Sequence, residues 1–318
     1  MKTSIERAWV AASNRAGVSP AKDGGFIIFL VDEKAGRNIY GGVDSEGNLL
    51  LAIEMGNIPP VIEIRSSALD YLRQERKGGE AWLMVFRLRR IELASVFGRL
   101  CQDLIDEIQG LVGDAALLSE VRKRIALWQR LFEISGRGLL ADFQIKGLLA
   151  ELLFLESQLS AGREPLEAAT GWVGPSGGDQ DFLFSERSFE IKAIAPNAEG
   201  VTISTLQQLD SKVPLRLSVW TMRPASPSEP RAETLNELVA RIEEAFAPVP
   251  AALQLFRDAM LEAGYVVHPY YSEIAFEPMH TEEFPVLEAF PRLTQSSVPS
   301  GVTAATYVVS LHKIRSAG

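Results

Sequence analysis

Acidic residues stand between residues 138 and 211 at places where an unpaired charge would be costly. Glu151 lies within GLLAELLFL (147–155), and its neighbours three and four positions away on a helix are apolar. The position indicates either a carboxylate that meets a cation or a metal, or the one solvated edge of an apolar helix. From this residue alone, both interpretations stay open.

A second carboxylate begins the apolar run DFLF (181–184), directly after a glycine-rich loop. Asp181 is preceded by Asp179, and in an extended chain both side chains point the same way. Either residue could be a metal ligand. Aspartate is also common in turns, so neither is diagnostic by itself.

Residues 188–194, SFEIKAI, predict a strand in which Glu190 and Lys192 share one face. A solvated edge strand with a loose ion pair would explain this pattern. However, the run lies between two other predicted strands, which favours a central position. Asp181 and Glu190 are nine residues apart, the length of a tight hairpin. Two carboxylates on such a hairpin suit Mg²⁺, with Lys192 beside a metal-bound water.

A short helix is predicted over residues 204–211, with Ser204 as its N-cap and Gln208 within it. The predicted elements of the core therefore follow in this order along the chain: a helix with Glu151, a strand with Asp181, a strand with Glu190 and Lys192, a helix with Gln208, and a further strand. The fold class that we predict is α/β (α+β), a mixed sheet flanked by helices, preceded by a β-rich module.

Domain boundaries follow from hydrophobic periodicity and turn residues. We expect a β-rich N-terminal module ending in a helix (1–112) and a second domain (113–318) with its core at 138–222 and an acidic helical and β extension. Further strands are predicted at 26–53, 61–65, 81–88, 215–222, 265–271, 273–276 and 305–314, and further helices at 66–77, 91–111, 121–134, 138–160, 231–246 and 251–263. The proline-rich stretch 223–230 predicts a linker.

Charge is concentrated in one stretch of the chain. Residues 226–290 hold twelve acidic residues and three arginines, which account for the whole formal net charge of −9. This balance argues against a non-specific nucleic-acid coat but permits a local site. Arg122, Lys123, Arg124 and Arg130 mark a helix face that either meets phosphates or is simply solvated, and we favour the solvated face.

Several other classes of protein are disfavoured. No apolar run is long enough to span a membrane, and Glu6 and Arg7 interrupt any signal-peptide core, so we expect a cytoplasmic protein without a membrane partner. The single Cys101 excludes a disulfide framework. Gly174-Pro175-Ser176-Gly177-Gly178 matches GxSxG, but strands rather than a helix are predicted after it, which favours a connecting loop over a hydrolase elbow.

The ordered residues Glu151, Asp181 and Glu190-x-Lys192 resemble the PD-(D/E)XK nuclease superfamily, which has the restriction-endonuclease-like fold. The strings GLLAELLFL, GWVGP, DFLF, FEIKAI and ISTLQQL are similar to a family of PD-(D/E)XK proteins linked to bacterial restriction and defence systems. The similarity covers residues 138–222. No proline directly precedes Asp181, and Asp179 remains an alternative, although Asp181 at the strand start matches the family better.

The resemblance implies a role for each matching residue. Asp181 and Glu190 would bind Mg²⁺ (or Mn²⁺) with the carbonyl of Ile191, and Glu151 would bind a second metal or a metal-bound water. Lys192 would orient or deprotonate the attacking water and stabilise the phosphorane, and Gln208 would orient Lys192 or the water.

Function follows from the same resemblance. It implies metal-dependent hydrolysis of DNA phosphodiester bonds in restriction or phage defence. The alternative is a catalytically silent nuclease-fold subunit that binds DNA or acts as a scaffold in a restriction complex. Partner proteins and a homodimer remain open.

Overall fold

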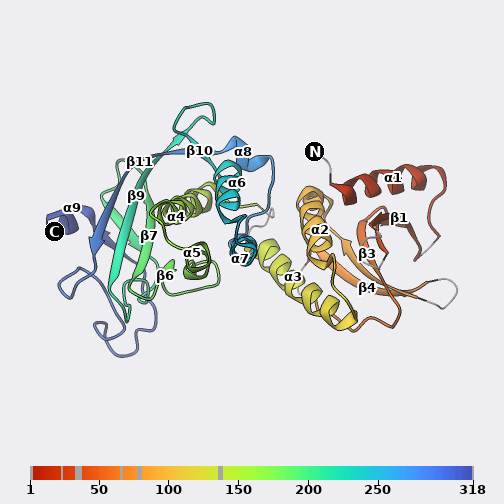
Figure 1. The fold of residues 1–318 in the computed structure, drawn as a ribbon, viewed down its shortest axis with the longest axis horizontal. Helices are drawn as coiled ribbons and strands as arrows, with labels where there is room; N and C mark the ends of the chain where they lie inside the picture. The colour runs from red at the N-terminus through yellow and green to blue at the C-terminus, as the bar shows by residue number, and fades with distance from the viewer. Residues whose placement is uncertain are drawn as a thin grey trace. The chain divides into compact units, whose positions relative to one another are not determined.

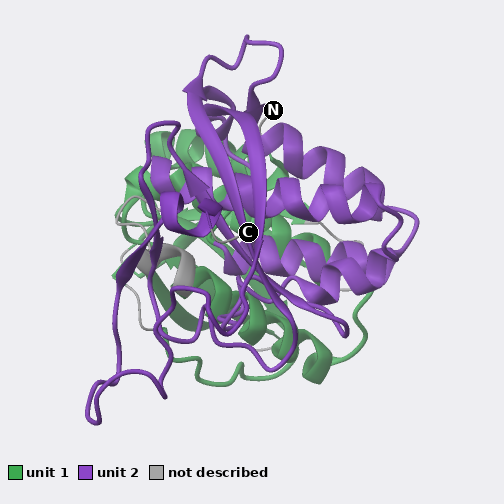
Figure 2. Ribbon diagram, turned by 90° about the vertical axis from the view of Figure 1, so that its left-hand side faces the viewer, with its two compact units in different colours: residues 1–139, 264–266 green, residues 140–263, 267–318 purple. Residues whose placement is uncertain are grey.

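The computed structural model describes residues 3–22, 24–32, 38–64, 67–76, 81–134 and 139–316. The chain is mixed α+β, as predicted, and forms two compact units: residues 1–139 with 264–266, and residues 140–263 with 267–318 (Figure 2). The boundary that we predicted after residue 112 precedes helix α3 (Asp114–Ile134), which belongs to the first unit.

A five-stranded antiparallel sheet organises the first unit, in the order β1-β2-β3-β5-β4. Its strands are β1 (Phe26–Asp32), β2 (Ile39–Asp44), β3 (Leu49–Met55), β4 (Leu69–Glu75) and β5 (Trp82–Leu88). The turn between β2 and β3 forms because the Asp44 carboxylate accepts the N–H groups of Glu46 and Asn48 while Gly47 adopts a positive φ of 87°. Residues 33–37, within the predicted β segment 26–53, lie outside the described residues.

Two local predictions in this unit are wrong. Residues 69–75 form β4 instead of a helix, because they pair with β5 from Leu69 opposite Leu88 to Glu75 opposite Trp82. Residues 61–64 form no strand. Arg65, Ser66 and Lys77, at the margins of these predictions, lie outside the described residues. Pairing with a neighbouring strand has overridden the local helical pattern in residues 69–75.

Helices complete the first unit: α1 (Ser4–Val18), the short 3₁₀ turn η1 (Ile91–Leu93), α2 (Ala94–Ile108) and α3. The predicted helices 91–111 and 121–134 are present, and α3 begins seven residues earlier than expected. Phe97 stacks on Trp9 at 5.4 Å between ring centroids and meets the edge of Trp128 at 6.1 Å. These contacts give the first unit an aromatic core of its own.

Arg124 of α3 is fully buried rather than placed on a phosphate-facing strip. Its guanidinium lies 3.3 Å from Asp103, 3.1 Å from Glu107 and 2.8 Å from Glu120. A buried cation must be paired in this way because its desolvation is costly. Both interpretations of this face, phosphate-binding and solvated, are therefore wrong for Arg124. Arg122 and Lys123 are exposed. The Arg130 side chain lies outside the described residues.

A mixed sheet organises the second unit, in the order β10-β11-β9-β7-β6 (Figure 1). Its strands are β6 (Phe182–Leu183), β7 (Ser188–Ile194), β9 (Leu215–Ala225), β10 (Glu233–Thr234) and β11 (Ala275–Pro285). The β7 and β9 strands run parallel, and the other neighbours are antiparallel. A separate two-stranded sheet pairs β8 (Gly200–Ile203) with β12 (Tyr307–Ser310).

Both faces of β7 are covered, as expected for a central strand. The helix α4 (Asp142–Ser160) packs Phe154 against Phe182 and Phe189, each at 4.7 Å between ring centroids. On the other face, Ile194, Leu217 and Val219 form an apolar cluster with residues of β8, β12 and α9 (Leu311–Ser316). Figure 1 shows α4 on one side of the sheet and α9 on the other.

The remaining helices are α5 (Pro165–Gly171), α6 (Leu235–Phe246), α7 (Pro250–Glu262) and α8 (Tyr270–Glu273). The helices α6 and α7 confirm the predictions at 231–246 and 251–263. Gly138, where the helix now seen as α4 was predicted to begin, lies outside the described residues. Among the described residues, no helix has the length and apolar character needed to cross a membrane.

Four predictions in the second unit need correction. Residues 204–211 form turns and no helix, and residues 223–230 are not a linker because β9 continues to Ala225. Residues 265–271 lead into α8 instead of forming a strand, and the predicted strand 305–314 divides into β12 and α9. The turn at 204–211 buries Leu206 and Leu209, so apolar anchoring replaces helical hydrogen bonding there.

Candidate functional site

The β6–β7 hairpin brings Asp181 against the Glu-x-Lys segment, as its length predicts. Phe182 pairs with Phe189 and Leu183 with Ser188. Asp181 lies just before β6, and its Oδ2 accepts the backbone N–H of Ile191 at 2.7 Å. The carboxylate therefore takes the place of the next partner in the strand ladder, which fixes it beside the centre of β7.

Glu190 and Lys192 share one face of β7 and form an ion pair. The Lys192 Nζ atom lies 2.7 Å from Glu190 Oε1, and the two side chains are 18% and 0% exposed. Apart from Lys192, neither Glu190 oxygen has a hydrogen-bond partner among the described residues. A fully buried carboxylate with so few partners is costly to maintain for folding alone.

Glu151 reaches the same region from α4. Its Oε2 accepts the indole N–H of Trp172 at 2.8 Å, which orients the carboxylate. Trp172 follows α5 and is 3% exposed, with its ring 5.9 Å from that of Phe256 between centroids. A packed indole thus holds the one carboxylate that interrupts the apolar face of α4, and Glu151 is not a freely solvated residue.

Electrostatic coupling ties the four side chains together. Burial, and then the charge of Asp181, raises the pKa of Glu151 to about 8. Burial, followed by Asp181, also raises the pKa of Glu190 well above its ordinary value. Burial raises the pKa of Asp181 too, although Lys192 and the Ile191 N–H act in the opposite direction. Burial alone would lower the pKa of Lys192, but Glu190 and Asp181 outweigh it and raise that pKa.

The donor atoms suit a hard divalent cation with few protein ligands. Across the described part of the chain, no three His, Cys, Asp or Glu side chains form a ready-made metal cage. Mg²⁺ nonetheless commonly binds through one or two carboxylates plus water and substrate phosphate. The Glu190 oxygens, which have no partner other than Lys192 among the described residues, fit that role. The Ile191 carbonyl lies on the same side of β7 as its N–H, and so faces Asp181.

Two of the sequence-predicted residues are placed differently. Asp179 is exposed, and it is Asp181 that bonds to Ile191. Gln208 uses its Oε1 to accept the N–H of Ser204 at 2.7 Å and so closes the 204–211 turn. Among the described residues, no hydrogen bond joins Gln208 to Lys192. Ser176 is exposed in its loop and donates to the carbonyl of Val173 at 2.9 Å, as expected for a connecting segment.

Sequence reasoning missed three residues that shape this region. Trp172 orients Glu151, and no local signal marks that contact. Gln180 is 7% exposed and donates to the carbonyls of Gln207 and Asp210 at 2.8 and 3.3 Å, which ties the turn to the residue next to Asp181. Gly174 leaves room for Asp181, because a Cβ there would lie 3.0 Å from Asp181 Oδ1. Its place in a glycine-rich loop was the one available hint.

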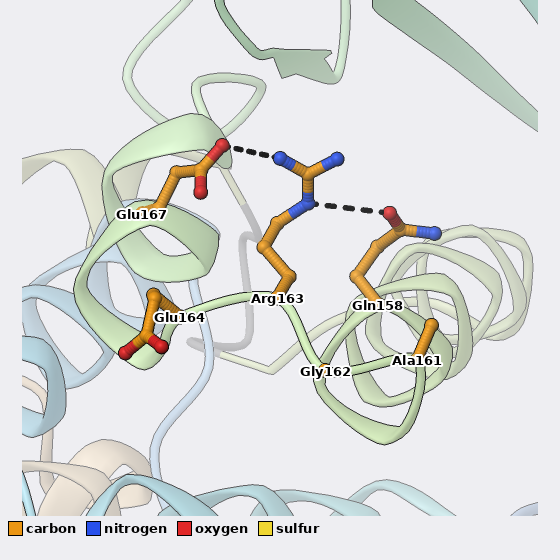
Figure 3. Close-up of a pocket in the computed structure, with 6 residues that line it drawn as sticks. All are labelled: Gln158, Ala161, Gly162, Arg163, Glu164 and Glu167. Carbon is orange, nitrogen blue, oxygen red and sulfur yellow. Dashed lines mark hydrogen bonds and ion pairs between the residues drawn. The ribbon is translucent and has the colours of Figure 1, made fainter.

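A pocket of about 300 Å³ lies at the C-terminal end of α4 (Figure 3). Its cation, Arg163, is already engaged by Glu167, by Gln158 at 3.4 Å and by Glu186 at 2.6 Å. The Arg163 guanidinium also lies 3.6 Å from the centroid of the Phe184 ring. With its charge satisfied, this pocket does not compete with the hairpin as a candidate site.

Comparison with known protein families identifies one that matches this chain. A family model described as "Putative PD-(D/E)XK family member, (DUF4420)" matches residues 5–312. The chain belongs to this family. Searches of curated proteins and of solved structures found no match. Membership of the family spans both units and supports a nuclease-like fold, in agreement with the resemblance seen in residues 138–222.

Proposed function

We propose that this protein is a divalent-metal-dependent DNA endonuclease that hydrolyses phosphodiester bonds. The observation that carries the proposal is the hairpin placement of Asp181 against the buried Glu190–Lys192 pair, with Glu151 in electrostatic contact. A role in bacterial restriction or phage defence follows from the similarity to families linked to those systems, and is part of the same proposal.

Each carboxylate has a distinct task in this proposal. Asp181, Glu190 and the Ile191 carbonyl would hold Mg²⁺ or Mn²⁺, and Glu151 would hold a second ion or a water on the first. A bound ion would supply Lewis-acid activation of water and of the scissile phosphate. The buried position of Glu190 excludes competing water from its oxygens.

Lys192 acts through its charge. Because Glu190 and Asp181 outweigh the effect of burial and raise its pKa, the ammonium stays protonated at neutral pH. A protonated lysine cannot accept a proton, so Lys192 does not deprotonate the attacking water. It instead orients that water and stabilises the charge that develops on the phosphate. Glu151, with its pKa near 8, exchanges a proton close to neutral pH, so in its ionised form it is the candidate proton acceptor.

Plasmid nicking tests the activity. Purified protein is incubated with supercoiled plasmid and Mg²⁺ or Mn²⁺, and open-circular DNA is quantified over time. We expect Asp181→Asn and Lys192→Ala to lower the nicking rate by about 100-fold or more, since each removes a charge at the reacting phosphate. Asp179→Asn is the matched control, because Asp179 is an exposed aspartate two residues from Asp181. Equal nicking by all variants would identify a contaminant.

Calorimetric titration with Mn²⁺ tests the site without the need for a preferred DNA sequence. We expect heat of binding in the native protein and in Asp179→Asn, and a loss of that heat in Glu190→Gln. Absence of Mn²⁺ binding by the native protein, together with retained DNA binding, would support the alternative of a catalytically silent subunit.

A further inference from the structure

One face of α4 packs against the hairpin after Glu151 and is open to solvent before it. After Glu151, Phe154 continues this face and packs on Phe182 and Phe189 of the hairpin. Before Glu151, the same face carries Gly147 and Phe143 at four-residue intervals. Phe143 is 74% exposed, although it lies on the face that is buried about three turns later, at Phe154. The uncovered part therefore begins where the candidate site lies.

Gly147 has no explanation within the fold itself. It lies in the interior of α4, where glycine costs about 1 kcal/mol relative to alanine. Its φ is not positive, and a Cβ at this position would meet nothing within 4 Å. Neither backbone conformation nor packing among the described residues requires glycine here. A bare stretch of helix next to Glu151 suits the close approach of another molecule.

Two neighbouring side chains have the chemistry of a nucleic-acid contact. Phe143 presents an aromatic ring to solvent. Lys146, on the adjacent part of the helix surface, is partly buried and has no acidic partner among the described residues. Most arginines of this unit, in contrast, are paired with carboxylates. Exposed aromatic rings beside unpaired cations are typical of surfaces that bind single-stranded nucleic acid.

We propose that the surface formed by Phe143, Lys146 and Gly147, here called the α4 shelf, binds an unpaired stretch of the DNA strand that enters the site. The strand passes over Gly147, Lys146 contacts a phosphate, and a base stacks on Phe143. The eight residues from Phe143 to Glu151 span about 12 Å of helix, the reach of a few nucleotides. This inference rests on the proposed function and adds a preference for locally unpaired DNA.

Oligonucleotide binding tests the α4 shelf independently of cleavage. Fluorescence anisotropy is measured with a labelled single-stranded 20-mer and with its duplex, in Ca²⁺ rather than Mg²⁺. We expect Phe143→Ala to weaken single-strand binding about tenfold, and to reduce the preference over duplex, because base stacking on an aromatic ring is lost. Leu287→Ala, which also removes an exposed apolar side chain, should stay within about twofold of the native affinity.

Substitutions of Gly147 provide a second test, in which one variant should gain thermal stability and a larger one should lose single-strand binding. Gly147→Ala should raise the melting temperature by about 2 to 4 °C, since a better helix former enters open space, and Gly147→Leu should weaken single-strand binding about fivefold or more by filling the shelf. Ala161→Leu, at the exposed other end of α4, is the control.

The outcomes separate the α4 shelf from the proposed function. Plasmid nicking with native single-strand affinity in Phe143→Ala and Gly147→Leu would overturn the shelf and leave the nuclease proposal standing. Failure of the native protein to bind the single strand would also overturn the shelf. A smaller molecular mass of Phe143→Ala in sedimentation would mean that a second copy covers Phe143, and would likewise contradict it. Loss of nicking alone, with shelf-dependent binding intact, would count only against catalysis.

Discussion

Glu151 combines two properties that rarely occur together, a place in an apolar helix and a carboxylate fixed by an indole N–H. The Trp172 bond favours the ionised form, but burial and the neighbouring charge of Asp181 dominate and raise the pKa of Glu151 to about 8. The residue therefore changes charge near neutral pH, where an ordinary glutamate is fully ionised.

Stability should fall as the pH rises, and Glu151 should account for part of this dependence. Between the unfolded pKa near 4.5 and the folded value near 8, the folded state binds the proton that the unfolded state has lost. The free energy of unfolding then decreases with pH by at most about 1.4 kcal/mol per pH unit for one group, and levels off above pH 8. Calorimetric melting from pH 5 to 9 measures this slope. Glu151→Gln should flatten it, whereas an unchanged slope would contradict the burial of this carboxyl.

The Glu190–Lys192 pair should show strong thermodynamic coupling. Lys192→Met leaves Glu190 buried without its cation, so we expect a loss of about 3 to 5 kcal/mol in the free energy of unfolding at pH 8. Addition of Glu190→Gln should restore most of that loss, because the uncompensated charge is gone. Urea unfolding of the two single variants and the double variant gives the coupling energy. Additive effects would mean that the two residues do not share one buried site.

At the residue scale, the sequence predicted those contacts that depend on local spacing. Glu190 and Lys192 share a face because strand alternation has a period of two, and Asp181 meets Ile191 because the hairpin is short. The bond from Trp172 to Glu151 joins residues 21 positions apart, and the acidic partners Asp103 and Glu107 of Arg124 lie on another helix. No periodic pattern records such contacts.

At the element scale, the loop before β6 positions Asp181. Gly174 donates its backbone N–H to the carbonyl of Asp181 at 3.0 Å, and so does Val173 at the same distance. A Cβ on Gly174 would lie 3.0 Å from Asp181 Oδ1 and 3.2 Å from its Cα. The glycine is therefore required by the close approach of the loop to the candidate ligand, and not by a special φ.

Gly174→Ala should displace Asp181 by a few tenths of an ångström and weaken Mn²⁺ binding about tenfold, because ligand distances in a metal site tolerate little change. Ser176→Ala, two residues along the same loop, should leave Mn²⁺ affinity and nicking unchanged, since its hydroxyl is exposed and donates to the Val173 carbonyl. Isothermal titration of both variants makes the comparison. An unchanged Mn²⁺ affinity in Gly174→Ala would mean that Asp181 is not a ligand. Loss of activity in Ser176→Ala would support a hydrolase that uses the GxSxG serine.

Elements with a strong periodic signal were predicted well, and those that depend on pairing were not. The amphipathic helices α2, α6 and α7 and the strand β7 match their predicted segments closely. The residues of β4 resemble a helix locally but pair with β5, and the turn at 204–211 is held by Gln180 and by its buried leucines rather than by a helical ladder. In both cases a partner distant in sequence decides the conformation.

At the scale of the whole molecule, each unit has its own buried core and its own buried ionic group. The first holds Arg124 among three acids, and the second holds the Glu190–Lys192 pair on β7. Separate cores are what allow domains to unfold as individual cooperative units.

We therefore expect two calorimetric unfolding transitions that respond to different perturbations. Arg124→Met should lower one transition, since it leaves three half-buried acids without their shared cation, and should leave Mn²⁺ affinity unchanged. Saturating Mn²⁺ should raise only the other transition, because a ligand stabilises the unit to which it binds by RT ln(1 + [L]/Kd). Glu190→Gln should abolish that rise without moving the Arg124-dependent transition. If Mn²⁺ shifted the transition that Arg124→Met lowers, the metal would bind in the first unit, and the assignment of the site to the β6–β7 hairpin would be wrong.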